Sequence, residues 1–462
     1  MFHVKHTAHF HREQTMNNTK LETAEKLFMA CQFDRAFPLF EELAEENNSR
    51  ALFFLGVLHG HGLGHVKRDQ EKSLTALEKS AVTGEPGAWV ELASLLYRRA
   101  EEIVAVDETL NHRILEKATA GDVISQYELG VLCINGWGVE QDIEGGSMWL
   151  KRAADAGFFM AMDDLGVLYK ERALGKGKGK DAWSYFLRAA GLGYRGGEFH
   201  LGECYYEGIG VEQDLEKAVT CYKRALAHGS MEAADALGTM AVLGEGMPAD
   251  EKAAFTYFRT AVKGGYIASL YKLGDCYYYG RGTAQDFGRA RDLFEKAWDN
   301  GDKAAAVRMG TIYLSGLGVE QDSRKAVDWF TQSAEAGDPD GIFYLGECAW
   351  YGEGTAEDKK KAVDLYVAAA EGGQEQAMTR LGQIALEEGH SEEAVQWFTR
   401  AAELGFTTAE NFLAICYYKG AGVPRNEKTA REWLDRSENQ GDEEAPLIKQ
   451  NLWGITPGSF KQ

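Results

Sequence analysis

The chain has 462 residues and a formal net charge of −21. Nucleic-acid binding requires basic stripes that neutralise phosphates, and an anionic membrane surface would repel this charge, so neither partner is expected. No stretch reaches the roughly 18–20 apolar residues of a membrane span, and the N-terminus has no apolar run of signal-peptide length. The seven cysteines are an odd number, and we expect reduced thiols in a cytoplasmic protein.

Residues 1–20 form an N-terminal head that we expect to be disordered or read from a wrong start. Its first six residues, MFHVKH, are what the palindromic chromosome-partitioning site of many bacteria would encode if it were translated. We therefore expect a bacterial protein whose translation starts at Met16 and not at Met1. On this interpretation the histidines of the head are not a metal-binding tract. Codons that break the palindrome would exclude the idea.

A helix hairpin with a short loop is predicted next, over residues 21–48, from the apolar spacing of LETAEKLFMACQFDRAFPLFEELAEE. Two series of glycines then recur at a fixed interval of 36 residues, which is the mark of a repeat array. The first series is Gly130, Gly166, Gly202, Gly238, Gly274, Gly310, Gly346 and Gly382. The second series is Gly121, Gly157, Gly193, Gly229, Gly265, Gly301, Gly337 and Gly373.

One period of the array predicts two helices. Met231–Leu243 has no proline and is rich in alanine, leucine and methionine, and a second helix ends at Gly265, where a left-handed cap is expected. Gly238 lies inside the first helix, where glycine costs about 1 kcal/mol relative to alanine, so we expect another helix to approach it closely. Because no hairpin buries its apolar face alone, the hairpins must stack, each contacting only its neighbours.

The pattern LG-x-x-Y-x-x-G-x-GV followed by KA-x-x-W/Y-F/Y-x-x-AA-x-x-G resembles the Sel1-like repeat, a relative of the tetratricopeptide repeat with a longer loop. One unit carries these matching residues: Leu201, Gly202, Tyr205, Gly208, Gly210, Val211, Lys217, Ala218, Tyr222, Ala225 and Gly229. The resemblance implies an all-α fold, a right-handed α-solenoid (α/α superhelix) of stacked helix hairpins with about eleven Sel1-like repeats over residues 49–441. Residues 21–48 would be a tetratricopeptide-like first hairpin, and residues 442–462 a C-terminal cap or tail.

Three units depart from the repeat pattern. One, near Leu92, has Ala93 in place of the helix-interior glycine, and another has GKGKGK at 175–180 in place of the usual loop. The tenth, LGQIALEEGHSEEAVQWF, has lost four loop residues and looks like a tetratricopeptide hairpin. That lysine-rich loop lacks the strand and the Ser/Thr of a phosphate-binding loop, so we expect a solvated loop. His59, His61 and His65 are zinc-ligand residue types, but they fall on an ordinary helix end and loop, and no metal is expected. The aspartates of the GVEQD loops precede second helices, which predicts N-cap roles: Asp142, Asp214 and Asp322.

Aromatic residues near the ends of the first helices recur in alternate units, 72 residues apart. Tyr205, Tyr277 and Tyr417 should face the core. The neighbouring positions are candidates for a groove-facing ladder of amphipathic anchors, the side chains favoured at binding hot spots: Tyr206, Tyr278, Tyr279, Trp350, Tyr351 and Tyr418. The alternative is packing between repeats with the hydroxyls at the surface, and the sequence leaves both interpretations open.

Proteins with this repeat act as adaptors, so the resemblance implies that a protein or an extended peptide binds on the concave face, lined mainly by the first helices. No catalytic residues belong to the repeat, and the chain has no GxSxG or HExxH motif. We therefore predict a non-enzymatic scaffold without a cofactor, and leave the oligomeric state open. The first alternative is a bacterial effector or regulator that blocks a target enzyme through its helix surface, and the second is an enzyme with an unrecognised site.

Overall fold

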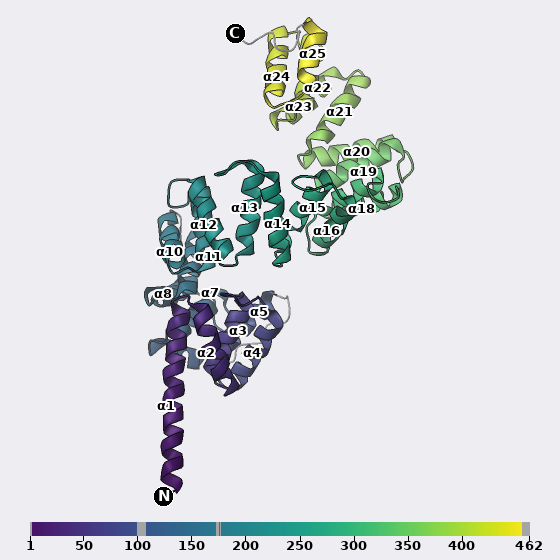
Figure 1. Ribbon diagram of the computed structural model, residues 1–462. Helices are drawn as coiled ribbons and strands as arrows, with labels where there is room; N and C mark the ends of the chain where they lie inside the picture. The colour runs from purple at the N-terminus through teal and green to yellow at the C-terminus, as the bar shows by residue number, and fades with distance from the viewer. Residues whose placement is uncertain (1, 99–107, 172–174, 176, 455–462) are drawn as a thin grey trace. The chain divides into compact units, whose positions relative to one another are not determined.

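The computed structural model describes residues 2–98, 108–171, 175 and 177–454. Every regular element of these residues is a helix, which confirms the predicted all-α class. The chain divides into two compact units, Met1–Tyr266 (unit 1) and Ile267–Gln462 (unit 2). In each unit helix hairpins follow one another along the chain, and each packs on the next, as a solenoid requires (Figure 1).

Unit 1 consists of seven helix pairs within the residues that the structure describes. The pairs are α1 (Phe2–Met29) with α2 (Phe33–Glu45), α3 (Ser49–His61) with α4 (Gln70–Val82), α5 (Gly87–Arg98) with α6 (Glu108–Thr119), α7 (Val123–Asn135) with α8 (Ile143–Asp155), α9 (Phe159–Lys170) with α10 (Gly179–Gly191), α11 (Arg195–Glu207) with α12 (Leu215–Ala227), and α13 (Met231–Leu243) with α14 (Glu251–Lys263). Helix α1 includes the N-terminal head, and a translation start at Met16 stays a prediction.

Unit 2 continues the pattern with five pairs and a final helix. A short 3-10 turn, η1 (Ile267–Ser269), leads into α15 (Leu270–Tyr279), which pairs with α16 (Phe287–Asp299); then follow α17 (Ala304–Ser315) with α18 (Ser323–Glu335), α19 (Pro339–Tyr351) with α20 (Lys359–Glu371), α21 (Glu375–Glu387) with α22 (Ser391–Glu403), α23 (Thr407–Lys419) with α24 (Glu427–Asn439), and α25 (Glu444–Trp453). The described part of residues 49–441 thus holds eleven consecutive pairs of helices, including the units whose sequences depart from the pattern.

The glycines and aspartates of the repeat have the local roles that their spacing predicts. Gly265 has a φ of +88° and ends its hairpin in the left-handed region. The three aspartates are N-caps, because their carboxylates accept a backbone N–H at 2.8 Å from Gly145, 3.0 Å from Lys217 and 3.0 Å from Lys325: Asp142, Asp214 and Asp322.

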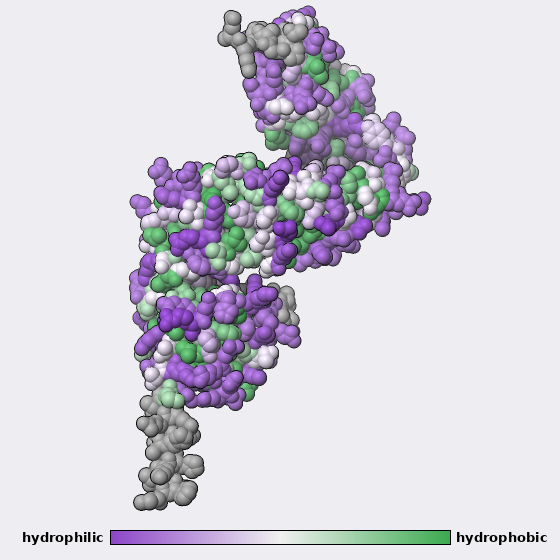
Figure 2. Space-filling model, viewed as in Figure 1, coloured by the Kyte–Doolittle hydropathy of each residue, from purple (hydrophilic) through white to green (hydrophobic). Residues whose placement is uncertain are grey.

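The glycine inside most first helices makes room for an aromatic or aliphatic side chain of the second helix. A Cβ on Gly238 would lie 2.5 Å from the Cε1 atom of Phe258, whose ring is almost fully buried. A close approach was predicted, but the approaching helix is the partner within the same hairpin and not the neighbouring hairpin. On the face shown in Figure 2, hydrophilic residues predominate and apolar residues form only small patches, as expected when these rings are buried.

Unit 1 contains contacts between hairpins that are not neighbours, so the prediction of neighbour-only contacts is wrong there. Arg195, the first residue of α11, donates to the carbonyl oxygens of His61 and Gly62 at the end of α3, with 2.7 Å to Gly62. The ring of Phe159 at the start of α9 lies 5.5 Å from the rings of both Phe28 and Phe33. The starts of α9 and α11 therefore meet the ends of α1 and α3 across the interior of the unit.

These contacts replace the usual helix caps. Phe158 and Tyr194 occupy the N-cap positions of α9 and α11 but make no side-chain capping hydrogen bond, whereas Asp122 and Ser230 cap α7 and α13 in the ordinary way. A missing cap costs about 1 kcal/mol. Buried aromatic packing across the unit offsets this cost, since Phe158 is 2% exposed and Phe159 is fully buried.

Candidate protein-binding face

The first helix of each hairpin has two faces with different surroundings. In α15, Gly274 faces the second helix, where its nearest neighbour is the ring of Phe294. Tyr271, Asp275 and Tyr278 follow one another at spacings of four and three residues, so they lie together on another side of the helix. The surface formed by these positions in successive hairpins is called the first-helix face.

Successive first helices touch one another as well as their own second helices. Contacts join α9 to α11 in unit 1 and α17 to α19 in unit 2, and they are more extensive than those between neighbouring second helices. At these places the hairpins approach one another on the first-helix side. That the first helices line a concave binding face stays a prediction from the sequence.

The Arg308 cluster is the first of two similar groups on the first-helix face of unit 2. Arg308 of α17 donates its Nε–H to an oxygen of Asp275 in α15 at 3.1 Å. Its guanidinium carbon lies 5.7 Å from the ring centre of Tyr278 and 5.4 Å from that of Tyr279. Tyr278 is half-buried and meets Tyr279 edge to face at 4.8 Å, while Tyr279 is 43% exposed.

The Arg380 cluster repeats this arrangement two hairpins later. Arg380 of α21 donates its Nε–H to Glu347 of α19 at 3.1 Å and another N–H to the hydroxyl of Tyr351. The guanidinium carbon lies 5.9 Å from the ring centre of Trp350 and 5.5 Å from that of Tyr351. Trp350 is half-buried, and Tyr351 is 56% exposed. Each cluster thus holds one exposed tyrosine against an arginine whose charge is already paired.

Burial and pairing set the protonation of these groups. Burial raises the pKa of Asp275, although Arg308 opposes the shift. Burial lowers the pKa of Arg308, but Tyr271, Asp275 and Tyr279 more than offset it and leave the pKa above its ordinary value. Arg308 therefore stays charged, and its position is fixed by the carboxylate and by stacking on the rings.

Two of the predicted ladder residues, Tyr206 and Tyr418, donate their hydroxyl hydrogen bonds to other groups of the protein. The hydroxyl of Tyr206 donates to Glu245 at 2.7 Å, and this bond raises the pKa of Tyr206. The hydroxyl of Tyr418 donates to the carbonyl oxygen of Leu452 at 2.9 Å, and its ring meets Trp453 edge to face at 5.1 Å. Both tyrosines therefore contribute to packing between successive elements.

The tyrosines expected to face the core lie at its edge. Tyr205, Tyr277 and Tyr417 are half-buried, and Tyr205 and Tyr417 pack against core clusters. A cation of the second helix lies over the first two rings, with Lys217 Nζ 5.5 Å from the centre of Tyr205 and the guanidinium of Arg289 5.5 Å from that of Tyr277. Cys204, not Tyr205, fills the buried position of its turn.

The two arginines were missed by sequence reasoning. Arg308 and Arg380 are 72 residues apart, as are Asp275 and Glu347. This is the interval of the aromatic pairs, so a search for charges with the same double period would have found both clusters. The aromatic pattern alone did not point to the two arginines, because each arginine lies in the hairpin that follows its aromatic residues.

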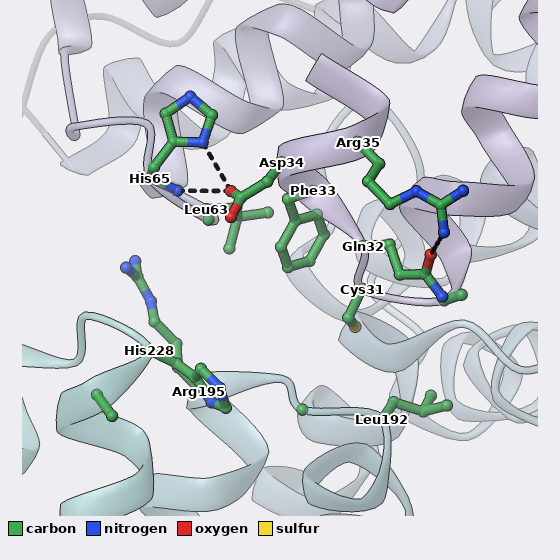
Figure 3. A pocket seen from close by; sticks show the side chains of 14 residues that line it. Cys31, Gln32, Phe33, Asp34, Arg35, Leu63, His65, Leu192, Arg195 and His228 are labelled. Atoms are coloured by element: carbon green, nitrogen blue, oxygen red, sulfur yellow. Dashed lines mark hydrogen bonds and ion pairs between the residues drawn. The ribbon is translucent and has the colours of Figure 1, made fainter. Parts of the chain in front are cut away.

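A cavity of about 690 Å³ lies in unit 1 where the non-neighbouring hairpins meet (Figure 3). Its polar side chains are engaged with one another, with backbone or, for His228, with Glu198. Asp34 accepts from the backbone N–H of His65 and bonds the imidazole Nδ1, both at 2.8 Å, and Arg35 donates to Gln32 at 2.7 Å. Arg195 is bound to backbone carbonyls. The cavity is therefore a joint between hairpins.

Cysteine and histidine positions favour no metal or redox centre among the described residues. All seven cysteines are free, and Cys31 and Cys133 are the two that are partly exposed. No group of three or more metal-ligating side chains occurs within the described residues. Among them, too, no helix combines the length and the apolar character that crossing a membrane requires.

Stacked helix hairpins with an aromatic first-helix face define a repeat solenoid of the kind that mediates protein–protein interaction. The Sel1 repeat model matches nine stretches of the chain: residues 49–81, 123–158, 197–230, 232–266, 267–302, 303–338, 339–374, 375–406 and 407–442. The chain belongs to the Sel1 repeat family. The unmatched gaps at 82–122 and 159–196 coincide with two of the three units whose sequences depart from the pattern, and the shortened third one is matched at 375–406.

Similar proteins occur in several organisms. DAP3-binding cell death enhancer 1 from Rattus norvegicus is 44% identical over 89 residues, which are 19% of this chain and 17% of the relative. A Sel1-like repeat-containing protein from Schizosaccharomyces pombe is 27% identical over 248 residues, 43% of this chain and 37% of the relative. The crystal structure of c5321, a protective antigen of uropathogenic Escherichia coli, matches with a TM-score of 0.58 and 27% identity over 90% of this chain and 82% of that one. The matches thus span less than half the length of either sequence relative.

Proposed function

We propose that this protein is a non-enzymatic scaffold that binds a protein or an extended peptide on the first-helix face of unit 2. The observation that carries the proposal is the pair of matched clusters. Each presents an exposed tyrosine, Tyr279 or Tyr351, whose ring is held by an arginine from the next hairpin. Tyrosines that are rigid before binding lose little entropy on contact and are enriched at hot spots.

The arginines act as positioning residues in this proposal. Arg308 and Arg380 each use Nε for a carboxylate of the preceding hairpin, so neither is a free cation that awaits an acidic partner. The surface between the clusters is neutral, with Thr311, Leu314 and Ser315 at the corresponding places of α17. The expected contact is therefore amphipathic, and it should depend only weakly on salt.

Replacing both exposed tyrosines by alanine should weaken partner capture at least about tenfold, because each removes a hot-spot anchor. The variant is Tyr279→Ala with Tyr351→Ala. The measurement is quantitative mass spectrometry of proteins captured from extract of the native organism, with thermal melting to check the fold. A partner captured equally well by the double variant would contradict the proposal.

Tyr313→Ala is the matched control. Tyr313 lies in α17 of the same unit and is half-exposed, but its ring packs under Lys325 of its own hairpin, with Nζ 4.6 Å from the ring centre. Capture should be unchanged in this variant. The captured proteins also distinguish the scaffold from the alternative of an effector that blocks a target enzyme. An effector should capture an enzyme and inhibit it, whereas a scaffold should leave the activity of a captured enzyme unchanged.

From the sequence we also propose that the protein is bacterial and cytoplasmic. The first codons of the gene test whether MFHVKH is a translated partitioning site, because codons that break the palindrome would exclude it. Fractionation of cells that express the tagged protein tests the compartment.

A further inference from the structure

A second pocket, of about 520 Å³, lies on the first-helix face of unit 1 between α7 and α9. It is called the α7–α9 pocket. One wall is aliphatic, with Val131, Ile134 and Val167 among its residues. Three aromatic residues also line it: Tyr127, Trp137 and Tyr194. A mostly apolar pocket with a few polar groups has the usual form of a binding site.

The polar group that distinguishes this pocket is Asp164 of α9. The hydroxyl of Tyr127 bonds its carboxyl group. No lysine, arginine or histidine among the described side chains makes an ion pair with it. His200, the cation whose effect on Asp164 is largest, is already paired with Asp163 at 2.8 Å. An ionised carboxylate that lines a mostly apolar pocket without a counter-charge is unfavourable in free energy.

The other carboxylates near the pocket reinforce its negative character. Asp163 and Glu91 both act on Asp164, and the carboxylate of Glu91 lies 3.6 Å from the imidazole of His61. The whole chain is acidic, with a net charge of −21, so a cation approaching this face is attracted before it makes contact.

A lysine or arginine side chain combines the features that these walls complement. Its methylene stem is apolar and its end is charged. The aliphatic wall fits the stem, the aromatic rings favour a nearby cation, and Asp164 supplies the missing counter-charge.

We propose that the α7–α9 pocket receives one basic side chain, lysine or arginine, of a protein partner, with the methylene stem against the aliphatic wall and the charged end beside Asp164. The pocket lies in unit 1 and uses none of the residues of the Arg308 and Arg380 clusters. It therefore adds a specificity for basic segments that the aromatic clusters lack.

The protonation of Asp164 gives this binding a pH dependence. Burial, with Asp163 and Glu91, raises the pKa of Asp164 to about 7. Below that pH the carboxyl group holds a proton and offers no charge. The other titratable groups that face it are on α3, α5, α7 and α11, with Tyr194 just before α11: His61, Glu91, Tyr127, Tyr194 and His200. Binding of a basic side chain should tighten between pH 6 and pH 8.

Fluorescence anisotropy with three short labelled peptides tests the proposal directly. The peptides alternate alanine with lysine, with arginine or with norleucine, so they share a stem and differ in charge. At pH 8 the full-length protein should bind the lysine or the arginine peptide at least about tenfold more tightly than the norleucine peptide. The two basic peptides decide which side chain fits better. Equal binding of the norleucine peptide, or no binding of any peptide, would overturn the proposal.

Asp164→Asn should abolish that preference, because asparagine keeps the shape and an acceptor for Tyr127 but carries no charge. The control is Glu144→Gln, which removes an exposed carboxylate of α8 outside the pocket. Equal losses in both variants would show general attraction to an acidic protein and would refute a specific pocket.

Ile134→Lys is a second test that does not depend on the stability of the asparagine variant. It places a resident ammonium at the pocket wall and should block the basic peptides. The equivalent position of the next hairpin carries Lys170, which is paired with Glu203 at 2.8 Å, and thermal melting checks that the variant folds. The double variant of Tyr279 and Tyr351 should bind the peptides normally, which separates this proposal from the function proposed for unit 2.

Discussion

Gly238→Ala is expected to destabilise the protein by about 1–3 kcal/mol, although alanine is a better helix former than glycine. In an exposed helix interior the same substitution would gain about 1 kcal/mol. At Gly238 the new Cβ would lie 2.5 Å from the ring of Phe258, and that ring is 3% exposed and enclosed by the core. Overpacking of this kind typically costs 1–3 kcal/mol, so the steric term wins.

The matched control is Gly191→Ala. Gly191 is the last residue of α10, and no atom outside its immediate surroundings lies within 4 Å of the position of an added Cβ. This variant should be unchanged or slightly stabilised. Urea unfolding followed by circular dichroism measures both. Shifts of the same sign in the two variants would contradict the packing role assigned to the glycine.

The repeat pattern predicted the local structure well because it records short-range requirements. A glycine 20 residues before a ring, as Gly238 is before Phe258, and an aspartate before a second helix are satisfied within one hairpin. Most hairpins meet these requirements in the same way, so the residues recur and become visible as a period. The positive φ at Gly265 and the capping bond of Asp214 follow from the same logic.

The sequence did not predict what is specific to one place in the solenoid. Phe159 and Arg195 meet hairpins far away in the sequence, and no period marks such a contact. The available signal was weak: aromatic residues stand at the N-cap positions of α9 and α11, but α23 has Phe406 at the same position. For the Arg308 and Arg380 clusters, the sequence pattern pointed to the aromatic residues as candidates but not to the arginines that contact them.

Glu128→Gln is expected to remove a fall in stability between about pH 5 and pH 8. Glu128 of α7 is 1% exposed, and neither of its carboxyl oxygens has a hydrogen-bond partner. Arg50 is the nearby cation, but it is already bonded to Glu25 at 3.0 Å, Glu85 at 3.1 Å and Asp122 at 2.9 Å. One guanidinium cannot neutralise a fourth carboxylate as well, so Glu128 retains its proton.

The direction of the effect follows from the pKa of Glu128 in the two states. Burial, assisted by Glu85, Asp122 and Glu91 and opposed by Arg50, raises it from 4.5 to about 8 in the folded protein. The folded state therefore binds the proton more tightly than the unfolded state. Its contribution to stability is complete below about pH 4.5 and is lost progressively as the pH rises towards 8. The loss should be on the order of 3 kcal/mol, given about 1.4 kcal/mol for each unit and some relaxation of the site.

Glutamine has the shape of the protonated carboxyl group and cannot ionise, so the free energy of unfolding of Glu128→Gln should change less between these pH values than that of the unmodified protein. Urea unfolding at pH 5 and at pH 8 gives the comparison, and Glu144→Gln, an exposed carboxylate of the neighbouring helix, is the control. The two proteins should converge at pH 5 and separate at pH 8, with the variant the more stable. Parallel pH profiles would mean that Glu128 finds a counter-charge and that the cluster around Arg50 holds four ionised carboxylates.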